Sequence, residues 1–246
     1  MLFDDREVTS IPGLLDALRD ITTPERVLWY RGHGKATWKL QPSIARSPVR
    51  TDSEMALITR FKQNALSFLV RPPSNEWEWL LLMQHHSLPT RLLDWTENPL
   101  VALYFVVKES PKAKGCLWCL DPIALNGARY KTPVPSSDIP CLGVDEELDS
   151  YLPKSVLTLP AKLPPAAALA MRSFPRLAAQ AGVFTITHKE QTSLEKVEKG
   201  KHVGRLLVPA AAKAGLAQEI AMLGITRLSL FPELESVARH AKEVVR

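Results

Sequence analysis

Apolar positions along the chain follow two different spacings. In several segments they recur every three or four residues, the period of an amphipathic helix, and in others they form short runs rich in β-branched and aromatic residues, as in strands. The helical spacing is clearest at 52–69, where Met55, Ile58 and Phe61 share one side. The other predicted helices are 10–20, 77–85, 210–223 and 234–244. The predicted strands are 27–30, 90–94, 116–121, 155–159, 183–187, 201–208 and 227–230.

These elements predict an α+β fold with a mixed, mostly antiparallel sheet and helices packed around it. The chain has 246 residues, of which 46% are hydrophobic and 23% charged. That composition is enough to bury a full core, so we expect a single domain over residues 1–246.

Residues 126–165 depart from this pattern because they are rich in proline and carry an acidic patch at Asp145, Glu146, Glu147 and Asp149. We expect them to form a long ordered excursion or a mobile lid rather than a linker between domains. After Pro164 and Pro165, the alanine run 166–168 predicts the start of a helix.

Residues 84–105 mix nearly every kind of polar side chain with an apolar helix. A buried polar group without a partner costs roughly 1–3 kcal/mol, so this mixture favours a site over core packing. The candidate site residues in this block are His85, His86, Arg91, Asp94, Trp95, Thr96, Glu97 and Asn98. Structural roles stay open, since Arg91 and Asp94 can form ion pairs, Trp95 can anchor a core, and a histidine can serve only as a hydrogen-bonding group.

The order of residues in this block predicts an anion-binding corner. Pro89 favours extended backbone before the strand, and Thr96 or Asn98 can cap the helix that begins at Pro99. A strand that leads into the N-terminus of a buried helix presents unpaired N–H groups, for which phosphate is a suitable ligand.

A second polar cluster follows the predicted strand 27–30, at Arg31, Gly32, His33 and Gly34. Arg31 can hold a phosphate or carboxylate through two parallel hydrogen bonds, and the glycines let backbone approach a substrate closely. The alternative for Arg31 is an ion pair with Asp94 or Glu54.

The net charge and the cysteine content restrict the possible ligands and chemistry of the protein only slightly. The net charge of +5, from 31 basic and 26 acidic residues without a long basic run, favours acidic partners modestly. Cys116 and Cys119 have CxxC spacing but lie in an apolar run without a second such pair, which favours packing over metal or redox chemistry. No apolar run is long enough to span a membrane, and we expect a cytoplasmic protein.

Several segments together resemble the FRG-domain family. They are YRG at 30–32, PSIAR at 42–46, QHHSLPTRLLDWTENPLVALYF at 84–105, RLAAQAGVFTIT at 176–187 and LFPEL at 230–234. The resemblance implies a protein of bacteria or phages, associated with conflict or defence.

A more distant resemblance to ADP-ribosyltransferases rests on the order of three motifs. Arg31 with Gly32, Thr90 or Thr96 before the helix 102–105, and Gln180 before the strand 183–187 occur in the order of that fold. The resemblance implies that Arg31 binds a phosphate of NAD, that the threonine supports the nicotinamide ribose, and that Gln180 begins the third motif.

One position departs from the ADP-ribosyltransferase pattern. Gly182 stands where those enzymes carry a catalytic glutamate. Either another acid substitutes, with Asp94 and Glu97 the nearest candidates, or the fold binds a nucleotide without transferring ADP-ribose.

The function that we expect is binding of NAD or a related nucleotide, with ADP-ribosyl transfer to a nucleic-acid or protein acceptor, or NAD glycohydrolysis. In this interpretation Asp94, His85 and Gln180 are catalytic candidates. The nucleotide-binding candidates are Tyr30, Arg31, Gly32, His86, Arg91, Trp95 and Thr96. Tyr30 or Trp95 would stack on a ring, and Thr96 with His85 or His86 would orient the ribose.

Two other functions stay open. The first is a non-enzymatic module that binds nucleic acid or protein, in which Arg31, Arg91 and Arg176 contact phosphates. The second is a metal-dependent nuclease, which is disfavoured because adjacent histidines on a helix point about 100° apart and share one metal poorly.

Overall fold

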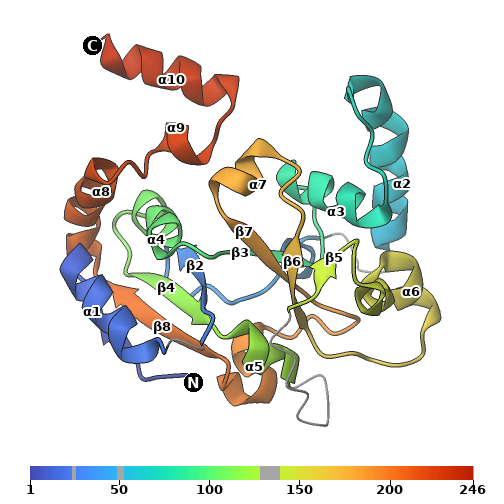
Figure 1. Cartoon of the computed structure of the whole chain (residues 1–246), viewed down its shortest axis with the longest axis horizontal. Helices are drawn as coiled ribbons and strands as arrows, with labels where there is room; N and C mark the ends of the chain where they lie inside the picture. The colour runs from blue at the N-terminus through green and yellow to red at the C-terminus, as the bar shows by residue number, and fades with distance from the viewer. Residues whose placement is uncertain (24–25, 49–52, 128–138, 246) are drawn as a thin grey trace.

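Eight strands form one open sheet in the order β1-β8-β4-β2-β3-β7-β6-β5 in the computed structural model, which describes residues 1–23, 26–48, 53–127 and 139–245 (Figure 1). The strands are β1 Arg6–Glu7, β2 Trp29–His33, β3 Leu92–Thr96, β4 Gly115–Leu120, β5 Cys141–Leu142, β6 Ala166–Ala170, β7 Gly182–Ile186 and β8 Val203–Val208. Only the edge pairs β1–β8 and β5–β6 are parallel, and the central pairings are antiparallel. The predicted α+β fold with a mixed, mostly antiparallel sheet is therefore confirmed.

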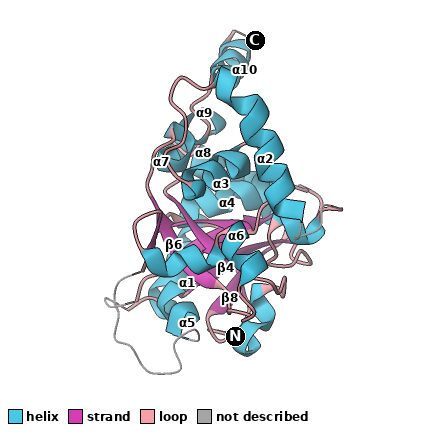
Figure 2. Cartoon of the chain, turned by 90° about the vertical axis from the view of Figure 1, so that its right-hand side faces the viewer, coloured by secondary structure: helices cyan, strands magenta, loops and turns pink. Residues whose placement is uncertain are grey.

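Helices cover both faces of the sheet, with α3 and α4 on one side and α5 on the other (Figure 2). The helices are α1 Ile11–Ile21, α2 Glu54–Ala65, α3 Glu76–His85, α4 Pro99–Lys108, α5 Pro122–Gly127, α6 Pro153–Thr158, α7 Pro175–Ala179, α8 Lys213–Met222, α9 Arg227–Leu230 and α10 Leu234–Val244. Short 3₁₀ helices are η1 Ser43–Arg46, η3 Leu66–Phe68, η4 Glu146–Tyr151, η5 Leu194–Gly200 and η6 Ala210–Ala212.

The apolar core consists of three clusters, two on one face of the sheet and one on the other. Helices α1, α4 and α8 pack on one half of the first face, over Tyr30 and Leu206. Helix α3 packs on the other half, over Leu92 and Phe184. The opposite face buries Trp29, Trp95 and their neighbours under α5 and η5. The candidate site lies between the first two clusters, where residues of α3, α4 and α7 line a cavity.

Three predicted elements were wrong in type. The segment 155–159 belongs to helix α6, which begins with Pro153 at a position where proline is favoured. The segment 227–230 is helix α9, held by a reciprocal capping box between Thr226 and Ser229. The alanine run 166–170 is strand β6 instead of a helix, because pairing with β7 and burial on both faces override the helical propensity of alanine.

Residues 128–138 of the proline-rich excursion lie outside the described residues. The described remainder is ordered as β5, η4 and α6. Within it, Tyr151 is fully buried and its hydroxyl donates to the Pro164 carbonyl at 2.5 Å. These contacts hold the described part of the segment against the rest of the domain.

Cys116 and Cys119 both lie in β4 and are buried. Side chains three residues apart on a strand point to opposite faces, and the two cysteines accordingly belong to different core clusters. Burial raises the pKa of both thiols. The spacing therefore reflects packing, as predicted.

In the described ranges no helix has both the length and the apolar character needed to cross a membrane.

Candidate functional site

Strands β2 and β3 separate near the middle of the sheet. They share one paired position, Tyr30 with Thr96, whereas β2 pairs with β4 at five positions and β3 pairs with β7 at five. If the ladder continued, Gly32 would lie opposite Asp94. Instead, the separation opens a gap in which backbone groups of β3 need other partners.

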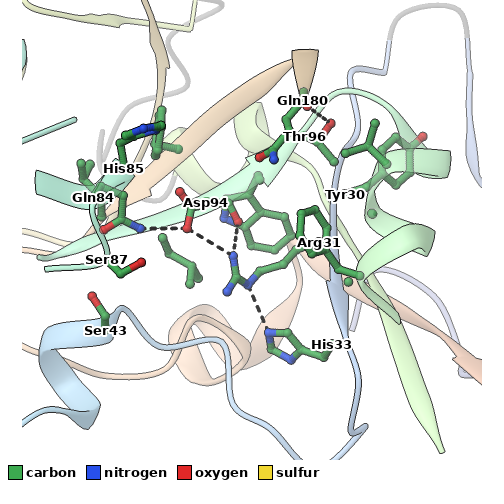
Figure 3. A pocket seen from close by; sticks show the side chains of 18 of the residues that line it. Tyr30, Arg31, His33, Ser43, Gln84, His85, Ser87, Asp94, Thr96 and Gln180 are labelled. Atoms are coloured by element: carbon green, nitrogen blue, oxygen red, sulfur yellow. Dashed lines mark hydrogen bonds and ion pairs between the residues drawn. The ribbon is translucent and has the colours of Figure 1, made fainter. Parts of the chain in front are cut away.

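The Arg31 guanidinium lies in this gap (Figure 3). Its Nη1 donates to the carbonyl oxygen of Asp94 at 2.5 Å and lies 3.8 Å from the Asp94 Oδ2 atom. Its Nε donates to His33 Nε2 at 3.1 Å. Among the described residues no acceptor binds Nη2. Two edges of the guanidinium are thus anchored by the protein, which leaves Nη2 available to a ligand.

The His33 ring is a neutral hydrogen-bond acceptor, and it orients the Arg31 side chain. Burial, followed by the positive charge of Arg31, lowers the pKa of His33 to about 3. A neutral imidazole whose Nε2 accepts a hydrogen bond carries its proton on Nδ1. Arg31 itself is largely buried, and this burial lowers its pKa, an effect that the Asp94 charge opposes.

The Asp94 carboxylate is held from its other side by Gln84, at the C-terminal end of α3. Gln84 Nε2 donates to Asp94 Oδ2 at 2.8 Å, and Gln84 Oε1 accepts a hydrogen bond from the Thr90 hydroxyl at 2.5 Å. The Thr90 side chain is fully buried, whereas that of Asp94 is 54% exposed. The buried Thr90 hydroxyl therefore fixes Gln84, and Gln84 in turn holds the accessible carboxylate of Asp94. Figure 3 shows the contact between Gln84 and Asp94.

Gly32 lets α4 pack directly on β2. A Cβ atom at this position would lie 2.0 Å from the Ala102 carbonyl oxygen, and one at Gly34 would lie 2.5 Å from the Glu109 Cβ atom. Gly32 also lines the cavity, and the two glycines allow close packing against α4 and against Glu109, the residue that follows it.

Thr96 and Gln180 connect β3 to the turn before β7. The Thr96 hydroxyl donates to the Gln180 carbonyl at 2.6 Å and accepts from the Asn98 N–H at 3.0 Å. Asn98 caps α4, which is one of the two predicted caps, by accepting a hydrogen bond from Leu100 N–H. The Thr96 hydroxyl is thus committed to two backbone groups, the Gln180 carbonyl before β7 and the Asn98 N–H at the start of α4.

The Leu177 side chain packs against Gly182, so a larger residue at this position would require Leu177 to move. A Cβ atom there would lie 2.2 Å from the Leu177 Cδ1 atom. The glycine that departs from the ADP-ribosyltransferase pattern thus lies against α7, and the described carboxylates that line the cavity are Asp94 and Glu109.

A cavity of about 790 Å³ brings most of the predicted residues together. Its floor is the separated part of β2 and β3, and its walls come from α3, α4 and α7. The predicted residues that line it are Tyr30, Arg31, Gly32, His85, Asp94, Trp95, Thr96, Arg176 and Gln180. Its volume lies within the range of roughly 300–1,000 Å³ that small-molecule sites occupy.

One wall of the cavity is aromatic. The His85 ring stacks on Phe174, with centroids 5.9 Å apart and planes 18° from parallel. Burial, followed by the charges of Arg176 and His86, lowers the pKa of His85, which favours its neutral form. The stacked pair can provide a flat, uncharged surface for a ring.

Arg91 and His86 do not line the cavity. Arg91 is 1% exposed, forms an ion pair with Glu54 at 2.6 Å and donates to the carbonyl oxygens of Thr187 and Tyr151. Its predicted role as a phosphate ligand is wrong, because every edge of the guanidinium is used in the core. His86 is exposed beyond the end of α3, where its ring is 4.9 Å from that of His85.

Trp95 and Glu97 also serve structural contacts. The Trp95 side chain is buried on the opposite face of the sheet and its indole N–H donates to Thr185 at 3.1 Å, so it cannot stack on a ligand ring. Glu97 forms an exposed ion pair with Arg172 outside the cavity. Of the two substitute acids considered from the sequence, Asp94 alone lines the cavity.

Several lining residues were not identified from the sequence, including Trp38, Lys39, Arg46, Glu109 and Phe174. Arg46 ends the PSIAR segment, and the other four lie outside the segments that carry the family resemblance. Trp38 gave the strongest available signal, because a tryptophan between two lysines is unusual in a buried segment.

The described residues contain no group of three or more His, Cys, Asp or Glu side chains able to hold a metal ion. The His85 and His86 rings are nearly perpendicular and lie in different surroundings. This arrangement gives no support to the metal-dependent nuclease.

Comparison with known proteins agrees with the resemblance seen in the sequence. No curated protein and no solved structure matches the chain. Residues 26–115 match the family described as the FRG domain, and this segment runs from just before β2 to the start of β4. It contains Arg31, His33, Gln84 and Asp94, together with the whole of α4. The matched segment is therefore similar to the FRG domain, and it supplies the floor and two walls of the cavity.

Proposed function

We propose that the cavity binds a nucleotide of the NAD type and that the protein cleaves its nicotinamide–ribose bond, as an ADP-ribosyltransferase or NAD glycohydrolase in a bacterial or phage defence system. The observation that carries the proposal is the pairing of Arg31 with Asp94 across the gap between β2 and β3, 3.8 Å apart, inside a cavity of ligand size.

The two charges suit the two ends of such a substrate. Arg31 has a free Nη2 and is oriented by His33, so it can bind a phosphate oxygen without rearranging. Asp94 presents a carboxylate that Gln84 holds in place. Near the ribose, this carboxylate would stabilise the positive charge that develops as the bond to nicotinamide breaks.

The proposed reaction breaks one bond and forms one bond at the ribose carbon. Nicotinamide leaves as a neutral molecule with the bonding electron pair, and the ribose carbon then bonds to an oxygen or nitrogen of water or an acceptor, which loses a proton. The stacked His85 and Phe174 rings offer a surface for nicotinamide or adenine.

Nicotinamide release from NAD by the full chain tests this proposal. Asp94→Asn keeps the side chain's shape and removes its charge, and we expect release to fall at least about 100-fold, the loss typical of removing one preorganised electrostatic group. Since the Asp94 side chain is half exposed, the melting temperature should hardly change.

Asp16→Asn is the matched control, because Asp16 forms an exposed ion pair with Arg19 outside the cavity. It should release nicotinamide at the wild-type rate. The proposal fails if the wild-type protein releases no nicotinamide, or if Asp94→Asn releases it as fast as Asp16→Asn.

A further inference from the structure

The mouth of the cavity carries a cluster of exposed basic and aromatic side chains that the proposed function does not use. It consists of Lys35, Trp38, Lys39 and Arg46, here called the basic rim. Trp38, Lys39 and Arg46 line the cavity, and the Lys35 ammonium lies 6.0 Å from the centroid of the Trp38 ring. All four side chains are exposed.

The loop that carries the basic rim is fixed in position. Ala36 N–H donates to the Lys114 carbonyl at 2.8 Å, and the carbonyl of the fully buried Leu40 accepts from Leu194 N–H at 3.0 Å. The Trp38 ring also contacts the edge of His33, with centroids 6.0 Å apart. A half-exposed tryptophan on a fixed loop is preorganised to stack on a ligand ring.

The charges of the basic rim are unneutralised in the described part of the chain. Lys35, Lys39 and Arg46 form no ion pair there, whereas Arg176 on the opposite wall pairs with Glu233 and lies over the Phe231 ring. Two carboxylates are near the rim. Glu195 accepts a hydrogen bond from Leu40 N–H, and Glu109 lines the cavity on the far side of Gly34.

We propose that the basic rim binds a single-stranded nucleic acid, with Trp38 stacking on a base and Lys35, Lys39 and Arg46 contacting phosphates. Cations that follow a backbone and an aromatic ring that stacks on a base are the two elements of sequence-tolerant single-strand binding. The rim is open to solvent and has a single exposed ring, so it suits a few nucleotides.

The position of the rim gives the bound strand a role. A strand held there passes directly over the cavity that contains Arg31 and Asp94, where it could present an acceptor group. This role rests on the proposed function, but binding of the strand does not, so the two can be tested separately.

Binding is measured by fluorescence anisotropy of a labelled 12-nucleotide single strand of mixed sequence, with the full chain, at 50 and 200 mM salt. Three phosphate contacts give a slope of log affinity against log salt of about −2, or about a twentyfold loss over this range. Trp38→Ala should weaken binding about tenfold at either salt concentration, while Trp38→Phe keeps most of the affinity. Lys39→Gln should reduce the slope by about 0.7.

Lys154→Gln is the control for the loss of one positive charge, because Lys154 is exposed on α6, away from the cavity. The proposal is overturned if Lys154→Gln acts as strongly as Lys39→Gln, if Trp38→Ala binds like the wild type, or if a duplex of the same sequence binds as tightly as the single strand. NAD binding is titrated in parallel. If the chain binds the single strand but not NAD, only the proposed function is overturned. If it binds NAD but not the single strand, only the role of the basic rim is overturned.

Discussion

Replacing His33 tests the geometry that orients Arg31. In the folded protein His33 has a pKa of about 3, against about 6.5 for an unperturbed histidine. Below pH 6.5 the unfolded chain therefore binds a proton that the folded chain does not. The stabilisation by neutral His33 is complete above about pH 6.5 and is lost as the pH falls toward 3, at about 1.4 kcal/mol per pH unit. From pH 7 to pH 5 the loss is about 2 kcal/mol.

The assay is urea unfolding of the wild type and His33→Gln at pH 7, 6 and 5. Glutamine keeps an acceptor for the Arg31 Nε–H but does not titrate. His188 and His202, whose pKa values burial also lowers, titrate in both proteins and cancel in the difference. The wild type should lose about 2 kcal/mol more than His33→Gln between pH 7 and 5. His240→Gln, on an exposed part of α10, controls for the substitution itself. If the wild-type and His33→Gln curves stay parallel, His33 is not held neutral by burial and Arg31.

Three further predictions concern packing. Glu54→Gln leaves the guanidinium of its partner buried without a counter-charge, so it should cost about 3–5 kcal/mol of unfolding free energy in a urea titration; a loss below about 1 kcal/mol would contradict the buried ion pair. Gly32→Ala should cost more than the roughly 1–3 kcal/mol of ordinary overpacking, because its Cβ atom meets backbone of α4, and an unchanged melting temperature would show that the contact is wrong. Of the three cysteines, only Cys141 should react with a thiol reagent in the native protein, since Cys116 and Cys119 are buried; labelling of all three under native conditions, read by mass spectrometry, would refute the packing of β4.

Strands that are buried on both faces were predictable from the sequence. β4, β7 and β8 are apolar runs flanked by turn or loop residues, and each strand lies within two residues of its predicted position. The error at β6 has a tertiary cause, because Ala166, Ala167 and Ala168 form a strand only where β7 is available for pairing and α5 covers them. The intrinsic helical propensity of alanine takes account of neither contact.

The candidate site was predictable as a cluster but not residue by residue. Arg31 and Arg91 look alike in sequence, since each adjoins a predicted strand with polar neighbours. Their roles differ because Glu54, which lies 37 positions from Arg91, is buried beside it, whereas Asp94 stays exposed beside Arg31. From the sequence, Glu54 was considered as a partner of Arg31, whereas in the structure it pairs with Arg91. The packing of α2, which carries Glu54, decides between the two arginines.

The most direct test of the account is a calorimetric titration of the full chain with NAD. Arg31→Met removes the guanidinium, whereas Arg172→Met removes an exposed cation that pairs with Glu97 outside the cavity. We expect saturable one-to-one binding by the wild type and by Arg172→Met, with binding lost in Arg31→Met while that variant remains folded. Absence of binding by the wild type, or equal binding by the folded Arg31→Met variant, would contradict it.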